Sequence, residues 1–208
     1  MTTTQTQQSL RRTSYGQQKL TIVDRYGVHL SQKAIERAMG RRRDLDVLDL
    51  GCGYHATLLR ALRLRIDRGV GVDVCISSEA RAESGLSFVE TTLENAAGTF
   101  PDRSYDLVLM ISVLEHLTDP INILTEIRRI IRPGGALLIN VPTWLGKRFL
   151  EFSAFRLGAS PASEIDDHKM YFDKRDLWPL LVRAGFQPRH IHLKYHKFGL
   201  NLFATVHA

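Results

Sequence analysis

A pair of glycines follows an apolar run that holds one acidic residue, and a second acidic residue ends the next apolar run. Val47–Gly53 reads VLDLGCG, with Asp49 near the end of an apolar run and Gly51 and Gly53 directly after it. A helical pattern follows, and a second apolar run, VGVD, ends in Asp73, roughly 20 residues after the glycines. This order predicts a strand, a tight turn, a helix and a parallel strand. Carboxylates at strand ends suit ribose hydroxyls better than phosphates, so we infer a pocket for a nucleoside-like cofactor.

The residues of the turn favour close approach of a ligand. Gly51 and Gly53 allow backbone conformations that a side chain would prevent. The helix expected from about Ala56 offers its unpaired N–H groups to the ligand. His55 follows the two glycines, and a histidine tolerates a left-handed backbone there better than most residues. It is either a turn residue only, or its ring lines the mouth of the cofactor or substrate site.

Strands and helices that position these residues alternate along the chain. A helical stretch is expected from near Lys19, and a helix capped by Ser31 and ended by Gly40 should follow it before the first strand. A helix starting at Pro120 should end at Pro133-Gly134-Gly135. The last segment reads as two strands joined near residues 197–199, one of which must be antiparallel. The five earlier strands are expected at about 46–50, 69–73, 86–91, 106–112 and 136–141. The chain is therefore expected to be an α/β protein with a doubly wound, mostly parallel sheet.

Composition and charge restrict the class of protein. The 208 residues suffice for one domain, expected at 19–208 after a disordered tail at 1–18, with 142–173 as an insertion on the substrate side. No apolar stretch resembles a signal peptide or a membrane span, which favours a cytoplasmic protein. Cys52 and Cys75 form no metal-binding pattern, so no metal is expected. The net charge of +6 is dispersed, which disfavours nucleic acid as a partner.

Three phrases together resemble a known family. They are VLDLGCG, FPDRSYDLVLMISVLEHLTDP at 100–120 and RPGGALLINVPT at 132–143. The chain resembles a class I S-adenosylmethionine-dependent methyltransferase of the small-molecule type, which includes ubiquinone and menaquinone biosynthesis enzymes. The resemblance implies a seven-stranded sheet of order 3-2-1-4-5-7-6 with strand 7 antiparallel. It also implies S-adenosylmethionine as cofactor, S-adenosylhomocysteine as product and a small-molecule methyl acceptor.

The same resemblance assigns residues to parts of the cofactor. Asp49, Gly51 and Gly53 would border the methionine portion, and Asp73 would bind the ribose. Ser112, after the fourth strand, would lie near the methionine carboxylate or the methyl group. The adenine would be contacted by Val74, Thr92, Leu93 and Glu94. Thr92 stands where the family usually has an aspartate, so adenine recognition would rely more on backbone groups or on Glu94.

Two histidines are candidates for a catalytic base. His116 follows the fourth strand at the edge of the sheet where ligands bind. His168 lies in the irregular segment after the fifth strand, beside Asp166 and Asp167, which could orient its ring. Each also has a purely structural interpretation, as a turn residue or as part of a charged surface loop.

Other functions remain open at this stage. A nicotinamide-dependent dehydrogenase shares the glycine turn and the acid after the second strand, but it does not explain the later phrases. A non-catalytic cofactor-binding or scaffolding protein would keep the same fold. A nucleic-acid methyltransferase is disfavoured because the chain has neither an N-P-P-Y-type motif nor a clustered basic surface. The acceptor and the oligomeric state stay open.

Overall fold

Strands and helices alternate from residue 45 onward in the computed structural model, which describes residues 14–17, 22–149 and 170–208. The strands are β1 (Leu45–Leu50), β2 (Ile66–Asp73), β3 (Leu86–Glu90), β4 (Tyr105–Ile111), β5 (Ile131–Pro142), β6 (Ile191–His196) and β7 (Asn201–His207). The α-helices are α1 (Ile22–Met39), α2 (Thr57–Ala61), α3 (Ser78–Arg81), α4 (Leu93–Ala96), α5 (Pro120–Ile130) and α8 (Lys174–Arg183). Short 3₁₀ turns are η1 (Arg63–Arg65), η2 (Ala97–Thr99), η3 (Leu114–His116), η4 (Pro188–His190) and η5 (Lys197–Gly199).

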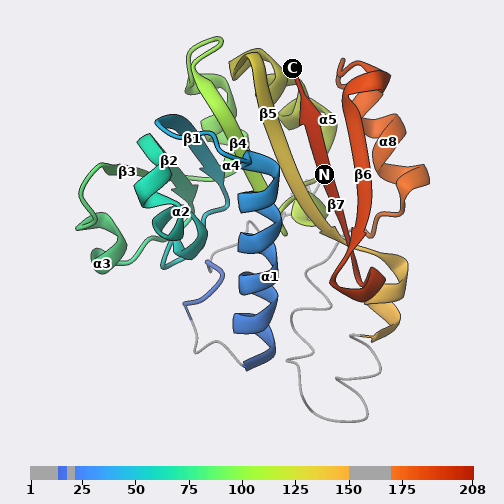
Figure 1. Ribbon diagram of the computed structural model, residues 1–208, viewed down its shortest axis with the longest axis horizontal. Coiled ribbons are helices and arrows are strands. Elements are labelled where there is room, and N and C mark those ends of the chain that lie inside the picture. The colour runs from blue at the N-terminus through green and yellow to red at the C-terminus, as the bar shows by residue number, and fades with distance from the viewer. Residues whose placement is uncertain (1–13, 18–21, 150–169) are drawn as a thin grey trace, which may run out of the picture.

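The strands form a seven-stranded sheet of order β3-β2-β1-β4-β5-β7-β6, which confirms the predicted topology. β1 pairs in parallel with β2 and β4, whereas β7 runs antiparallel to both β5 and β6. The carboxyl ends of the parallel strands therefore share one edge, at the bottom of Figure 1. Ligands of open α/β sheets bind at this carboxyl edge.

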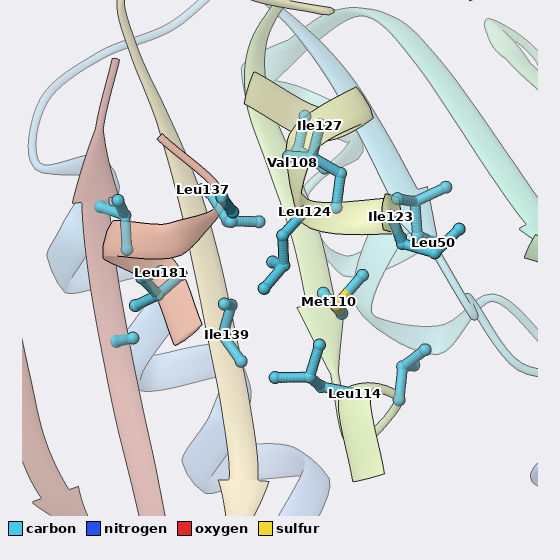
Figure 2. Close-up of a cluster of buried hydrophobic side chains, with 14 of the residues drawn as sticks. Leu50, Val108, Met110, Leu114, Ile123, Leu124, Ile127, Leu137, Ile139 and Leu181 are labelled. Carbon is cyan, nitrogen blue, oxygen red and sulfur yellow. The ribbon is translucent and has the colours of Figure 1, made fainter. Parts of the chain in front are cut away.

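Both faces of the sheet are covered by helices, because successive strand residues point to opposite sides. On one face, α5 and α8 pack against strand residues such as Leu48, Val108 and Leu137. Figure 2 shows this cluster, in which Ile123, Leu124, Ile127 and Leu181 face the strands. On the other face, α1 and α2 pack against Val47, Leu107, Leu109 and Leu138. The two cores make the sheet a rigid platform for its carboxyl edge.

The N-terminal helical region forms one continuous helix in place of a helical stretch followed by a separate helix capped at Ser31. Ser31 was expected to cap it, but α1 begins at Ile22 and passes through Ser31. The Ser31 hydroxyl donates to the Gly27 carbonyl at 3.1 Å, so it is satisfied inside the helix. Gly40, with φ +58°, ends the helix as predicted.

The turn at Pro133-Gly134-Gly135 was expected to end α5, and this expectation is wrong. The helix ends at Ile130, and the three residues lie inside β5. Ile131 already pairs with Tyr105, and the register shifts before Ala136 pairs with Leu107. Sheet pairing thus starts the strand earlier than the turn residues suggest, and Gly134, with φ +79°, serves an irregularity of the strand.

The other elements lie close to their expected positions. The short helix expected from Ala56 to Leu64 is split into α2 and η1. Pro120 occupies the first turn of α5 as predicted, and the Asp119 side chain caps that helix. The expected insertion at 142–173 falls mostly outside the described residues. Within the described ranges, no helix has the length and apolar character needed to cross a membrane.

Candidate cofactor site at the carboxyl edge

The turn after β1 brings backbone to the carboxyl edge without side chains. Gly51 and Gly53 both have φ +77°, a left-handed conformation that favours glycine. A Cβ on Gly51 would collide with the Val113 side chain, and one on Gly53 would lie 3.1 Å from the Tyr15 carbonyl oxygen. The two glycines therefore keep the turn tight and its backbone open to a ligand.

The left-handed residue at the start of α2 is Ala56 and not His55, which corrects the expectation for the histidine. Ala56 has φ +46° and ψ +42°, is fully buried, and precedes the helix without a side-chain cap. His55 does not have positive φ; its ring meets that of Tyr54 edge-on with centroids 4.9 Å apart. The left-handed conformation thus falls on a residue whose small side chain is buried in the core.

The Asp73 carboxylate ties the two strand ends together. One of its oxygens accepts a hydrogen bond from the Gly53 N–H at 2.8 Å, and the other accepts from the Val74 N–H at 2.8 Å. The residue is only partly buried. Because each carboxylate oxygen can accept more than one hydrogen bond, both can still receive ligand hydroxyls.

Asp49 lies deeper and in a different electrostatic environment. It is 1% exposed, and its Oδ2 has no hydrogen-bond partner within the described residues. Burial, together with the negative charge of Asp73, raises the pKa of Asp49 to about 7. A buried acid whose oxygen lacks a partner favours a cationic group beside it. The two acids, together with the open glycine turn, fit a nucleoside that carries a positive charge.

The end of β4 adds a second polar group to this edge. Ser112 is exposed and has φ +58°, and its N–H donates to the Asn140 carbonyl at 2.8 Å. The Asn140 side-chain amide donates to the Ser112 hydroxyl at 3.3 Å. Asn140 is fully buried, and its Oδ1 lacks a partner among the described residues. Sequence reasoning missed Asn140, although a lone amide inside the apolar run ALLINV was a usable signal.

The expected adenine-edge residues follow β2 and β3 at the same edge. The Thr91 N–H donates to the Asp73 carbonyl at 3.0 Å, which holds the two strand ends together. Thr92 starts the turn into α4, and its carbonyl accepts from Ala96. Leu93 packs against the core, whereas Glu94 is exposed. Val74, directly after the ribose candidate Asp73, is partly buried and offers an apolar surface.

Of the two candidate bases, the structure describes only His116. It ends η3, is partly buried, and its N–H donates to the Val113 carbonyl at 3.0 Å. This places His116 four residues beyond Ser112, at the carboxyl edge of β4. The second candidate, His168, lies outside the described residues together with Asp166 and Asp167.

A short N-terminal segment also reaches the glycine turn. The Tyr15 carbonyl accepts a hydrogen bond from the Tyr54 N–H at 2.8 Å, and Ser14 is only 6% exposed. Residues 14–17 form a turn here, although the sequence suggested a disordered tail through residue 18. The contact is made by backbone to the glycine turn, so the polar composition of the segment did not reveal it.

Comparison with known proteins agrees with a site for a nucleoside-like cofactor. A family model described as a methyltransferase domain matches residues 23–191. A probable S-adenosylmethionine-dependent methyltransferase of Mycolicibacterium smegmatis is 29% identical over 81% of this chain and 61% of its own length. A mitochondrial ubiquinone biosynthesis O-methyltransferase of Dictyostelium discoideum is 28% identical over 55% of this chain and 40% of its own. The chain thus spans less than two thirds of the length of these relatives.

Solved structures share the fold. An S-adenosylmethionine-dependent methyltransferase from Mesorhizobium loti superposes with a TM-score of 0.63 at 16% identity, covering 85% of this chain and 96% of that one. A chain from the complex of the Haloferax volcanii Trm112 methyltransferase activator with a methyltransferase gives 0.66 at 20% identity, covering 92% and 99%. The match of the family model over most of the chain, on this sheet order, shows that the chain belongs to the methyltransferase-domain family, whose cofactor is S-adenosylmethionine.

Proposed function

We propose that the protein transfers a methyl group from S-adenosylmethionine to an oxygen or nitrogen atom of a small-molecule acceptor. The observation that carries this proposal is that Asp49 and Asp73 both lie beside an open glycine turn at the carboxyl edge. Asp73 is only partly buried and can accept hydrogen bonds from hydroxyl groups. Asp49 is buried, and a cationic group fits beside it. The ubiquinone O-methyltransferase among the relatives supports an oxygen acceptor.

In this proposal, each residue of the site contacts a different part of the cofactor. Asp73 accepts hydrogen bonds from the ribose hydroxyls, while the Gly51–Gly53 turn and Asp49 border the methionine portion. Ser112, held by Asn140, faces the methionine carboxylate or the methyl group. The adenine lies against Val74, with the edge residues Thr92, Leu93 and Glu94 beside it.

The cofactor supplies an electrophilic methyl group on a sulfonium, so the protein's main tasks are to orient the reactants and to exclude water. A hydroxyl acceptor loses its proton as the new bond forms, and a neutral imidazole can take that proton near pH 7. His116 is a candidate because it lies at the carboxyl edge beyond β4. His168 is the other candidate, on its sequence context alone.

The test of this function is a transfer assay with methyl-labelled S-adenosylmethionine and a panel of phenolic, hydroxyl and amine acceptors. Formation of S-adenosylhomocysteine that depends on the acceptor supports the proposal. Tight cofactor binding without transfer to any acceptor would favour a scaffolding role. His116→Asn and His168→Asn then separate the two bases: loss of the true base lowers turnover by about 10²–10⁴-fold with cofactor affinity nearly unchanged.

A further inference from the structure

Lys197 lies in the hairpin turn between β6 and β7, at the same edge of the sheet as the two acids. Asn201, the first residue of β7, pairs with Pro142, the last residue of β5. The turn η5 therefore lies beyond the carboxyl end of β5, beside the helical turn at 144–149 (Figure 1, dark red beside gold). A side chain that points inward from this turn lies at the carboxyl edge, which also holds the candidate cofactor site.

The backbone of this turn is held in an unfavourable conformation. Lys197, Phe198 and Gly199 have φ +49°, +60° and +86°, so three successive residues are left-handed and two of them carry side chains. Residues with a side chain rarely adopt this conformation, because their Cβ crowds the following carbonyl oxygen. Thr143 stabilises the turn: its hydroxyl donates to the Gly199 carbonyl at 2.7 Å, and its N–H donates to the Leu200 carbonyl at 3.0 Å.

This conformation separates two neighbouring side chains. Phe198 is 87% exposed, whereas Lys197 is partly buried. The Lys197 ammonium lies 3.6 Å from the position that a Cβ on Gly27 of α1 would take. The side chain thus runs from the hairpin to the N-terminal half of α1, across the carboxyl edge.

The electrostatic surroundings of Lys197 allow its ammonium group to bind an anionic ligand. Burial lowers the pKa of Lys197 to about 8, and the Glu115 carboxylate in η3 opposes part of this shift. Glu115 is 1% exposed, whereas Lys197 is only partly buried, so an entering ligand meets the lysine. Within the described part of the chain, the ammonium makes no hydrogen bond and no ion pair. A protonated, partly buried amine in this state favours an anion as its partner.

Exposed apolar side chains stand on the elements that the Lys197 side chain connects, α1 and the β6–β7 hairpin, and on the helical turn beside them. Tyr26, next to Gly27, is 54% exposed, and Phe198 is more exposed still. Leu145 is 54% exposed, and its Cδ2 lies 3.5 Å from the Cβ position of Gly199. An acceptor that reaches Lys197 would therefore meet apolar surface on the way.

We propose that Lys197 binds an acidic group of the methyl acceptor, and that the acceptor is an acid with an apolar body. This inference rests on the proposed methyl transfer, since it names the class of acceptor for that site. Lys197 is then a residue that determines specificity and takes no part in the chemistry at the methyl group.

Calorimetry with a matched pair of probes tests the inference. The full chain is saturated with S-adenosylhomocysteine and titrated with benzoate and with benzamide, which have similar shape but differ in charge. We expect the wild type to bind benzoate at least about tenfold more tightly than benzamide, as a charge-assisted contact implies. Lys197→Met should remove this preference. Lys194→Met, an exposed lysine of β6, should retain it.

The affinity for S-adenosylhomocysteine should be the same in all three proteins, which shows that both variants are folded. Equal binding of benzoate and benzamide by the wild type would overturn the inference. A preference that persists in Lys197→Met, or that is lost equally in Lys194→Met, would overturn it as well. Failure of the wild type to bind S-adenosylhomocysteine is a different result, because it would contradict the proposed methyl transfer itself.

Discussion

At the scale of single residues, the site depends on two carboxylates in different surroundings. Asp73 is partly buried and accepts two backbone hydrogen bonds, whereas Asp49 is almost fully buried and has an oxygen that no described residue contacts by a hydrogen bond. The same chemical group can therefore serve two purposes: one accepts hydroxyls, and the other responds to charge.

Asp73→Ala should weaken binding of S-adenosylhomocysteine by about 1.5–3 kcal/mol, the range for hydrogen bonds to a charged group. The measurement is calorimetry on the folded variant. Asp67→Ala provides the control, because Asp67 is an exposed acid on the same strand. If the Asp73 variant is folded and its dissociation constant is unchanged, the ribose acceptor lies elsewhere.

The raised pKa of Asp49 predicts that the free energy of unfolding depends on pH. Its pKa is raised from 3.8 to about 7 in the folded protein, so the native state holds a proton that the unfolded state releases. The free energy of unfolding should therefore fall as pH rises from about 4 to 7, and the loss should persist above 7. Asp49→Asn should abolish this loss and be more stable than the wild type at pH 8, by on the order of 2–4 kcal/mol.

Urea unfolding at pH 4, 6 and 8 measures this effect in the ligand-free protein. The wild type and Asp49→Asn should differ little at pH 4, where the carboxyl group is protonated in the native state. Asp67→Asn should leave the wild-type pH profile unchanged. A difference between wild type and Asp49→Asn that is constant with pH would show that ionisation of Asp49 is not its cause.

The sequence predicted that the two acids and the two glycines lie together, because motifs of one segment carry them. Asp49, the two glycines and Asp73 all lie within one strand-turn-helix-strand unit, whose spacing is fixed by local geometry. Asn140 and Lys197 were missed because their positions depend on pairing between distant strands. The left-handed backbone was expected at His55 because histidine tolerates it better than most residues, whereas the structure has it at the buried Ala56.

At the scale of elements, the helical turn at 144–149 is fastened directly onto the β6–β7 hairpin. Gly146 is buried, and its N–H donates to the Thr143 hydroxyl at 3.0 Å. A Cβ on Gly146 would collide with the Leu200 carbonyl oxygen. The two elements can approach this closely only because residue 146 is glycine.

Gly146→Ala should therefore separate the helical turn from the hairpin and cost about 1–3 kcal/mol of stability, as overpacking does. Thermal unfolding measures the loss. Gly98→Ala is the matched control, since a Cβ on Gly98 would meet no atom within 4 Å, and it should change stability little. Equal melting temperatures for Gly146→Ala and wild type would show that the contact yields without cost.

The error at Pro133-Gly134-Gly135 belongs to this scale too. From local propensity alone, proline and glycine predict the end of a helix. In the folded chain, Ile131 pairs with Tyr105 and draws these residues into β5. The ends of elements thus depend on tertiary pairing, whereas the existence and order of the elements followed from the hydrophobic pattern.

At the scale of the whole molecule, the predicted order of the sheet is confirmed, including the antiparallel β7. Near-continuous apolar runs indicated parallel strands buried on both faces, and the two clusters of core residues agree with that pattern. The terminal hairpin required one antiparallel strand, because a short turn cannot connect parallel neighbours. The residue pattern therefore predicted parallel strands with one antiparallel strand, and the resemblance to the methyltransferase family implied their order, whereas the placement of side chains from distant segments was not predicted.

The central claim is that the carboxyl edge of this sheet binds S-adenosylmethionine and its product. Calorimetric titration of the full chain with S-adenosylhomocysteine and, separately, with NAD tests it most directly. We predict one saturable site for S-adenosylhomocysteine and no measurable heat of binding for NAD. Tight binding of NAD with no response to S-adenosylhomocysteine would contradict the account.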